Sequence, residues 1–161
     1  MGCDIHVYLE IKKKINDVER WVNIDHWQKN PYFNMEGYED ERELEHVSVY
    51  WGRNYELFGI LAGVRDNSMN PIDDPRGLPD DISNETRKEY ELWGRDAHTP
   101  TYFTLDELLD FYQKKPKYRE TLDYFLTGIK ERFDNEFIFT RNNKRNKEYE
   151  EKFRVIFWFD N

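Results

Sequence analysis

Residues 3–12 read CDIHVYLEIK, and apolar and polar side chains alternate along the whole stretch. Because successive side chains of a strand point to opposite sides, this pattern predicts a strand with one buried face and one polar face. The apolar set is Cys3, Ile5, Val7, Leu9 and Ile11, and the polar set is Asp4, His6, Tyr8, Glu10 and Lys12. Residues 13–18, which include Asn16-Asp17, predict a turn, and residues 19–24 predict the returning strand of a hairpin.

The rest of the chain predicts helices that lie between two pairs of strands. Helices are expected at about 54–64, 83–93, 104–115 and 118–133, the third opened by a capping box of Thr104 and Glu107. The runs at 136–140 and 153–159 predict a second, C-terminal hairpin. We therefore expect an α+β fold, with an antiparallel sheet built from the N- and C-terminal hairpins and helices packed on one face.

Three segments predict loops. Residues 26–46 are polar and irregular, which favours a surface insertion. Residues 66–81 carry Pro71, Pro75, Gly77 and Pro79, a density that excludes a helix or central strand. Residues 94–100 run from a glycine to a proline and predict another loop. The chain has no internal repeat and no linker, so a single domain is expected over residues 1–161.

The composition limits the partners. The chain has 24 Lys and Arg against 33 Asp and Glu, a formal charge of -9, so nonspecific binding to nucleic acid or anionic membrane is disfavoured. Eleven Tyr, eleven Phe and five Trp supply the apolar surface for a core. Cys3 is the one cysteine, which excludes an internal disulfide and a thiolate metal cluster. With neither a membrane span nor a signal peptide in the sequence, we expect a cytoplasmic protein.

Several short segments together resemble a family of short phage and prophage proteins. They are Met1-Gly2-Cys3-Asp4-Ile5-His6, Arg53-Asn54-Tyr55-Glu56-Leu57-Phe58, Leu61-Ala62-Gly63-Val64-Arg65, Pro75-Arg76-Gly77-Leu78-Pro79, Asp96-Ala97-His98 and Phe157-Trp158-Phe159-Asp160. The resemblance covers nearly the whole chain. The sequence departs from the family pattern mainly in the polar insertion before Val47. It implies a host-cytoplasm setting and a role in countering host defence, but no particular chemistry.

The motif Asp-x-His occurs twice, at Asp4/His6 and at Asp96/His98. On a strand, Asp4 and His6 project from the same polar face. If the second pair joined them, the four side chains could hold Zn, Mn or Fe, with His6, Asp96 and His98 as catalytic residues. Each pair could equally be an acid–base couple, or a buried hydrogen-bonded pair that fixes a loop.

Cationic and aromatic side chains supply candidates for ligand binding. Arg53, Arg65 and Arg76 lie in loops or at element ends, where they could clamp phosphate or carboxylate, or form structural ion pairs. A nucleobase could stack on Tyr55, or on Tyr8, Trp51 or Trp93, although core packing also accounts for such residues. Cys3 is expected in the core. Asp160 is expected on the Asp4 face if the last strand neighbours the first, and His26 and His46 are expected to be solvated.

Two main hypotheses follow, with a third beside them. The first is a metal-assisted, phosphodiesterase-like hydrolase of a nucleotide or nucleotide-derived signal. The second is a binding protein without chemistry that sequesters a small anionic nucleotide signal of host immunity. The third is an inhibitor of another protein that uses the acidic insertion. The apolar ending, residues 157–159, fits either the core or the seam of a homo-oligomer.

Overall fold

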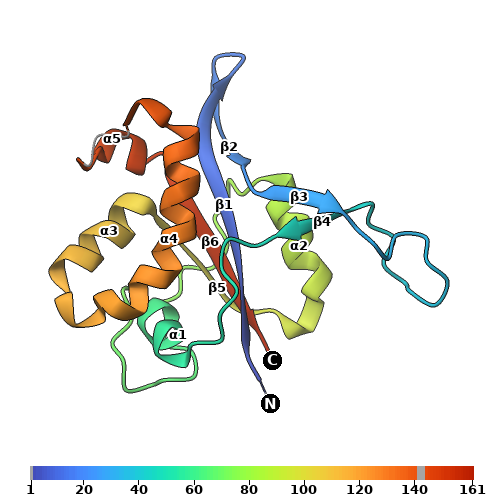
Figure 1. The fold of residues 1–161 in the computed structure, drawn as a ribbon, viewed down its shortest axis with the longest axis horizontal. Coiled ribbons are helices and arrows are strands. Elements are labelled where there is room, and N and C mark those ends of the chain that lie inside the picture. The colour runs from blue at the N-terminus through green and yellow to red at the C-terminus, as the bar shows by residue number, and fades with distance from the viewer. Residues whose placement is uncertain (1, 141–143) are drawn as a thin grey trace.

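The computed structural model describes residues 2–140 and 144–161 and is organised around a four-stranded antiparallel sheet (Figure 1). The order of its strands is β2-β1-β6-β5. The strands are β1 (Asp4–Ile15), β2 (Val18–Asn23), β5 (His98–Thr104) and β6 (Phe153–Asp160). This confirms the α+β class and the antiparallel sheet. The N- and C-termini lie side by side in Figure 1, because Asp4 and Asp160 are register partners of β1 and β6.

The N-terminal hairpin forms as the alternation predicts. Cys3, Ile5, Val7, Leu9 and Ile11 are all buried on one side of β1. Asn16 and Asp17 make the turn with φ angles of 50° and 63°, the left-handed conformation that a two-residue hairpin turn requires. Cys3 lies in the core, as expected, and burial raises the pKa of its thiol.

The C-terminal strand β6 has a different partner from the predicted one. Residues 136–140 form no strand, because α4 (Arg119–Glu136) continues through the start of this run and a 3-10 turn (Ile138–Thr140) follows. On the side away from β1, β6 pairs with β5, which lies within a region predicted to be largely loop. Pro100 is tolerated there because β5 is an edge strand and its register with β6 is irregular between His98 and Thr101.

One face of the sheet is covered by α1 (Tyr55–Ala62), α3 (Leu105–Lys114) and α4, with α5 (Lys147–Glu150) at one end (Figure 1). The Asn54 side chain accepts the Leu57 N–H at the start of α1. The predicted capping box of Thr104 and Glu107 opens α3. The core between these helices and the sheet includes Val7, Leu57, Phe58, Phe103, Phe125, Ile129, Phe157 and Phe159, all fully or almost fully buried.

Helices lie on both faces of the sheet, not only on one. The helix α2 (Asn84–Trp93) covers the opposite face, where Tyr90 and the preceding Ile82 pack against Tyr8, Ile156 and Trp158. This face presents the polar side of β1, so its cover is smaller and includes charged groups. The Ser83 side chain accepts the Thr86 N–H and begins the helix, as the sequence predicts.

A buried ion pair fixes α2 to the sheet. Arg154 of β6 donates from Nε and Nη2 to Glu10 Oε1 at 3.0 and 2.7 Å, and both side chains are almost completely buried. The second oxygen, Glu10 Oε2, accepts the Ser83 N–H and the Thr86 hydroxyl, each at 2.9 Å. Both carboxylate oxygens are therefore satisfied, and the start of α2 is tied to the centre of the sheet.

The predicted surface insertion contains a hairpin of its own. Strands β3 (His26–Lys29) and β4 (Leu44–Val47) form a two-stranded sheet that extends from the main body beside α2 (Figure 1). Its register places Trp27 opposite His46. Residues 34–39, in the loop between these strands, are exposed.

In the described part of the chain, none of the helices has the length and apolar character needed to cross a membrane.

Candidate functional site

A cavity of about 800 Å³ opens on the α2 face of the sheet, where β1, the end of β4, the segment after β4 and α2 meet. The polar and aromatic residues that line it include Asp4, His6, Tyr8, Arg42, Glu45, His46, Trp51, Arg53, Glu89, Trp93 and Asp160. Tyr8, Trp51 and Trp93, three of the aromatic residues considered for stacking, are among them. We call this cavity the α2-face pocket.

His6 forms a close pair with Asp160 on the pocket wall. The His6 Nε2 atom lies 2.7 Å from Asp160 Oδ2, and the two side chains are 21% and 14% exposed. The pair forms because β1 and β6 are neighbours, which brings Asp160 to the Asp4 face as expected. The His6 ring also packs on Trp93, with ring centroids 4.1 Å apart. A carboxylate and an aromatic ring together fix the orientation of the imidazole.

Asp4 pairs with Arg53 at the mouth of the pocket. Arg53 donates from Nε and Nη2 to the two oxygens of Asp4 at 2.8 and 2.6 Å. These hydrogen bonds lower the pKa of Asp4 below its ordinary value. Both side chains are about half exposed, so the pair is open to solvent and to ligands.

Tyr8 and Glu89 join the sheet to α2 across the pocket floor. The Tyr8 hydroxyl donates to Glu89 Oε2 at 3.0 Å, and Arg42 approaches Glu89 Oε1 at 3.4 Å. Burial raises the pKa of Tyr8 far above its usual value, and the nearby Glu89 raises it further. Tyr8 is therefore a neutral hydrogen-bond donor in this site.

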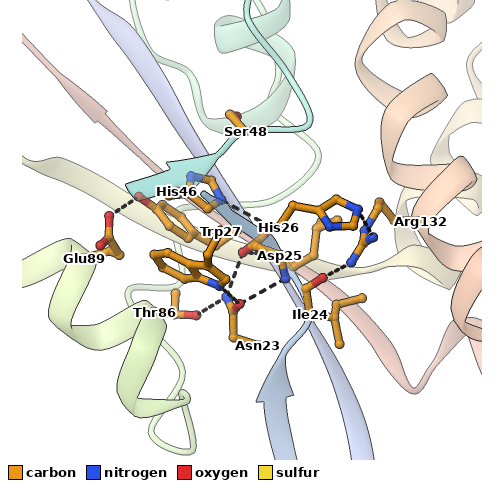
Figure 2. Close-up of polar contacts among 12 residues, drawn as sticks. Asn23, Ile24, Asp25, His26, Trp27, His46, Ser48, Thr86, Glu89 and Arg132 are labelled. Atoms are coloured by element: carbon orange, nitrogen blue, oxygen red, sulfur yellow. Dashed lines mark hydrogen bonds and ion pairs between the residues drawn. The ribbon is translucent and has the colours of Figure 1, made fainter. Parts of the chain in front are cut away.

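A second carboxylate–imidazole pair is formed by Asp25 and His46 (Figure 2), and it lies beside Tyr8. His46 Nε2 lies 3.4 Å from Asp25 Oδ1, and the two side chains are 9% and 0% exposed. The His46 ring stacks on Tyr8 at 4.1 Å. The expectation of a solvated His46 is corrected, because the β3–β4 hairpin folds back on the sheet and buries its side chain. His26 is exposed and contacts Arg132.

Asp25 is held in place by its other oxygen. Its Oδ2 accepts the Leu9 N–H at 3.1 Å and the Asn23 amide at 2.7 Å. Asn23 in turn accepts the Trp27 indole N–H at 3.2 Å through its side-chain oxygen, and Figure 2 shows these groups gathered at the base of the hairpin. Nothing in the spacing of Asp25 and His46 signals this pair, because twenty residues separate them and the hairpin brings them together.

The second Asp-x-His motif lies elsewhere. His98 is paired with Phe159 in the register of β5 and β6, and its ring stacks on Phe159 at 6.0 Å. Phe159 belongs to the face that α1 covers, whereas His6 pairs with Trp158 on the α2 face. Asp96 is exposed in a 3-10 turn. The structure therefore places His6 and His98 on opposite faces of the sheet and does not bring the two motifs together.

The four predicted metal ligands accordingly do not converge. Within residues 2–140 and 144–161, no three His, Cys, Asp or Glu side chains gather as a metal site would require. His98 Nδ1 lies 3.0 Å from the Thr99 hydroxyl, and its Nε2 is buried with no hydrogen-bond partner among these residues.

Of the other predicted ligand-binding residues, only Arg53 lines the α2-face pocket. Arg76 donates to both oxygens of Glu107 and to Asp73. Arg65 donates to Asn161 at 2.8 Å. Tyr55 begins α1 and packs against Phe58. Arg76 therefore forms structural ion pairs, which is one of the two roles that the sequence allowed for it.

The chain was also compared with protein-family models, curated proteins and solved structures, and none of them matches it.

Proposed function

We propose that this protein hydrolyses a small phosphate ester of the nucleotide class in the α2-face pocket, with His6 as an acid–base group. The observation that carries the proposal is the 2.7 Å contact between His6 Nε2 and Asp160 on the wall of a cavity large enough for a small molecule. An imidazole oriented by a carboxylate is the usual carrier of protons in hydrolysis near neutral pH.

The geometry leaves the second ring nitrogen of His6 for the substrate. Nε2 is engaged by Asp160, so Nδ1 is the atom that would take a proton from water or give one to a leaving oxygen. Packing on Trp93 limits rotation of the ring. A positioned imidazole needs no reorientation when the substrate binds.

The pocket also carries groups suited to a nucleotide. Trp51 is 75% exposed and Trp93 is 36% exposed, so both offer flat surfaces on which a base can stack. Arg42 and Arg53 lie among the lining residues and are 40% and 51% exposed. Each is paired with a carboxylate, and a phosphate would bind by sharing or displacing that partner.

The alternative is a protein that binds the same ligand without chemistry. It is favoured by the open mouth of the pocket, where Trp51 and the Asp4–Arg53 pair are exposed to solvent. Capture of a planar anion needs only these groups. This alternative keeps the ligand class and removes the role of His6 in turnover.

The test is a screen of cyclic and linear nucleotides by thermal shift and by chromatography of the reaction products, with added divalent metal ions and with a chelator. We expect at least one nucleotide to stabilise the protein and to be cleaved, and His6→Ala to reduce the rate by about 10²–10⁴-fold. The matched control is His26→Ala, which removes an exposed histidine outside the pocket and should leave the rate unchanged.

Two results decide between the alternatives. A nucleotide that stabilises the protein but is recovered unchanged after denaturation supports the binding protein and contradicts the hydrolase. If no nucleotide in the screen stabilises the protein or is cleaved, both are contradicted.

A further inference from the structure

His46 reaches the pocket through the β3–β4 hairpin. The register of the hairpin sets His46 opposite Trp27, and the Trp27 indole donates to Asn23, next to the point where the hairpin leaves the sheet. In this position the His46 ring stacks on the Tyr8 ring, with 4.1 Å between their centroids. Figure 2 shows His46 and Asp25 directed toward each other above the strands. The hairpin thus positions one imidazole on the wall of the pocket.

The Asp25–His46 pair is buried and incompletely satisfied. Asp25 Oδ1 and His46 Nε2 are both buried, and among the described residues neither has a hydrogen bond of good geometry, although they lie 3.4 Å apart. A shift of a few tenths of an ångström with a proton on Nε2 would satisfy both atoms. Asp25 cannot turn away, because Leu9 and Asn23 hold its other oxygen. Nδ1 is then the ring nitrogen left for a ligand.

The two imidazoles belong to the wall of one pocket. His6 and Tyr8 are alternate residues of β1 on the same face, which places their Cα atoms about 7 Å apart. His6 packs on Trp93, and His46 packs on Tyr8. Both histidines line the same cavity. A group bound in this cavity would therefore lie near two imidazoles, each held by a carboxylate.

We infer that His46, held by Asp25, is a second acid–base residue of the α2-face pocket and that the substrate is a phosphodiester. This inference rests on the proposed function. Displacement at phosphorus is in line, with the attacking and leaving oxygens on opposite sides, so it requires a base at one end and an acid at the other. Two separate imidazoles on one pocket wall supply both.

The step balances without a further reactant. The oxygen of water attacks phosphorus as one imidazole takes its proton. The bond from phosphorus to the leaving oxygen breaks as the other imidazole gives that oxygen a proton. The products are a phosphomonoester and an alcohol, and the two histidines recover their starting protonation states by exchange with solvent.

The leaving group separates the two roles. We compare a dithymidine monophosphate, whose leaving alkoxide needs a proton, with a thymidine p-nitrophenyl phosphodiester, whose leaving phenolate does not. On the first substrate, His6→Ala and His46→Ala should each lower kcat by about 10²–10⁴-fold. On the second substrate, the variant that lacks the acid should lose less than about tenfold, and the variant that lacks the base should keep its full loss.

His46→Gln accompanies His46→Ala, because it keeps more of the buried volume where the alanine variant could fail to fold. His26→Ala, in the same hairpin but outside the pocket, is the control and should match the unchanged protein on both substrates. Thermal unfolding of every variant checks that the fold is retained.

The outcomes separate this inference from the proposed function. If His6→Ala abolishes cleavage and the folded His46 variants cleave both substrates at the normal rate, the second acid–base residue is disproved and the proposed function stands. Equal losses of both variants on both substrates also contradict the division of roles. If the unchanged protein cleaves neither substrate, this inference fails, and the nucleotide screen alone then decides the proposed function.

Discussion

The two faces of the central sheet are made from the same strands and behave differently. On the face covered by α1, α3 and α4, alternate residues of β1 and β6 pack in the main apolar core, and Phe157 and Phe159 are fully buried. On the face covered by α2, the intervening residues of the same strands include His6, Tyr8 and Glu10. One strand thus supplies a sealed core on one side and a hydrogen-bonded pocket on the other.

The difference follows from the kinds of side chain that each face buries. Burial of a carboxylate or imidazole is costly without a partner, and on the α2 face Glu10 is paired with Arg154, His6 with Asp160, and Asp25 with His46. The apolar face needs no such pairing, because its side chains are stabilised by contact area alone. Substitutions on the two faces should therefore alter different properties.

The largest effect is expected from Phe157→Ala on the apolar face. The side chain is fully buried against Phe103 and Phe159, so its truncation should cost about 3–5 kcal/mol of unfolding free energy. Nucleotide affinity of the folded variant should not change. Denaturant unfolding and a binding isotherm measure the two quantities.

Leu92→Ala is the matched substitution on the pocket side. Leu92 is 59% exposed and lines the pocket, so its loss should change stability by less than about 0.5 kcal/mol and weaken nucleotide binding. If Phe157→Ala weakened binding as strongly as Leu92→Ala, the two faces would not be independent.

A loss of stability smaller than that of Phe157→Ala is expected from Tyr8→Phe on the α2 face. The variant keeps the ring that stacks on His46 and Trp158 and removes the hydroxyl that donates to Glu89 at 3.0 Å. Because the acceptor is a nearly buried carboxylate, the loss should be about 1.5–3 kcal/mol. Urea unfolding measures it, and Tyr124→Phe, at a tyrosine that is 65% exposed, is the control. A variant as stable as the unchanged protein would show that the hydroxyl does not anchor α2.

Local signals predicted much of this fold. The alternation at residues 3–12, the Asn16-Asp17 turn and the capping box at Thr104 each act within a few residues, and each forms as expected. The position of β5 was missed because Pro100 reads as a loop in isolation. Only the edge position of the strand and its irregular register make the proline compatible with the sheet.

The lining of the candidate site was predictable on strand β1 and not beyond it. Asp4 and His6 face the pocket because the period of a strand dictates it, and Asp160 joins them through the pairing of the terminal strands. The repeated Asp-x-His motif suggested that both copies belong to one site. That prediction was wrong, because His98 faces the other side of the sheet. The Asp25–His46 pair depends on a hairpin folding back over β1, which no local pattern in residues 26–46 encodes.

A still smaller effect than that of Tyr8→Phe is expected at the edge of the apolar face, where Arg76 pairs with Glu107. Burial alone would raise the pKa of Glu107, but hydrogen bonds from Arg76 and from the Thr104 backbone outweigh it and lower the pKa below its usual value. A carboxyl with a lowered folded-state pKa stabilises the protein above its unfolded pKa of about 4.3, and this stabilisation is lost as the pH falls through the folded value.

Glu107→Gln should therefore cost about 0.5–1 kcal/mol at neutral pH, a figure reduced for solvent screening because the glutamate is 37% exposed. The gap between the two proteins should close below about pH 4, as the native carboxyl is protonated. Unfolding in urea from pH 7 to pH 3 measures it, with the exposed Glu91→Gln as the control. A constant gap over that range would mean that the variant loses packing or capping and not the ion pair.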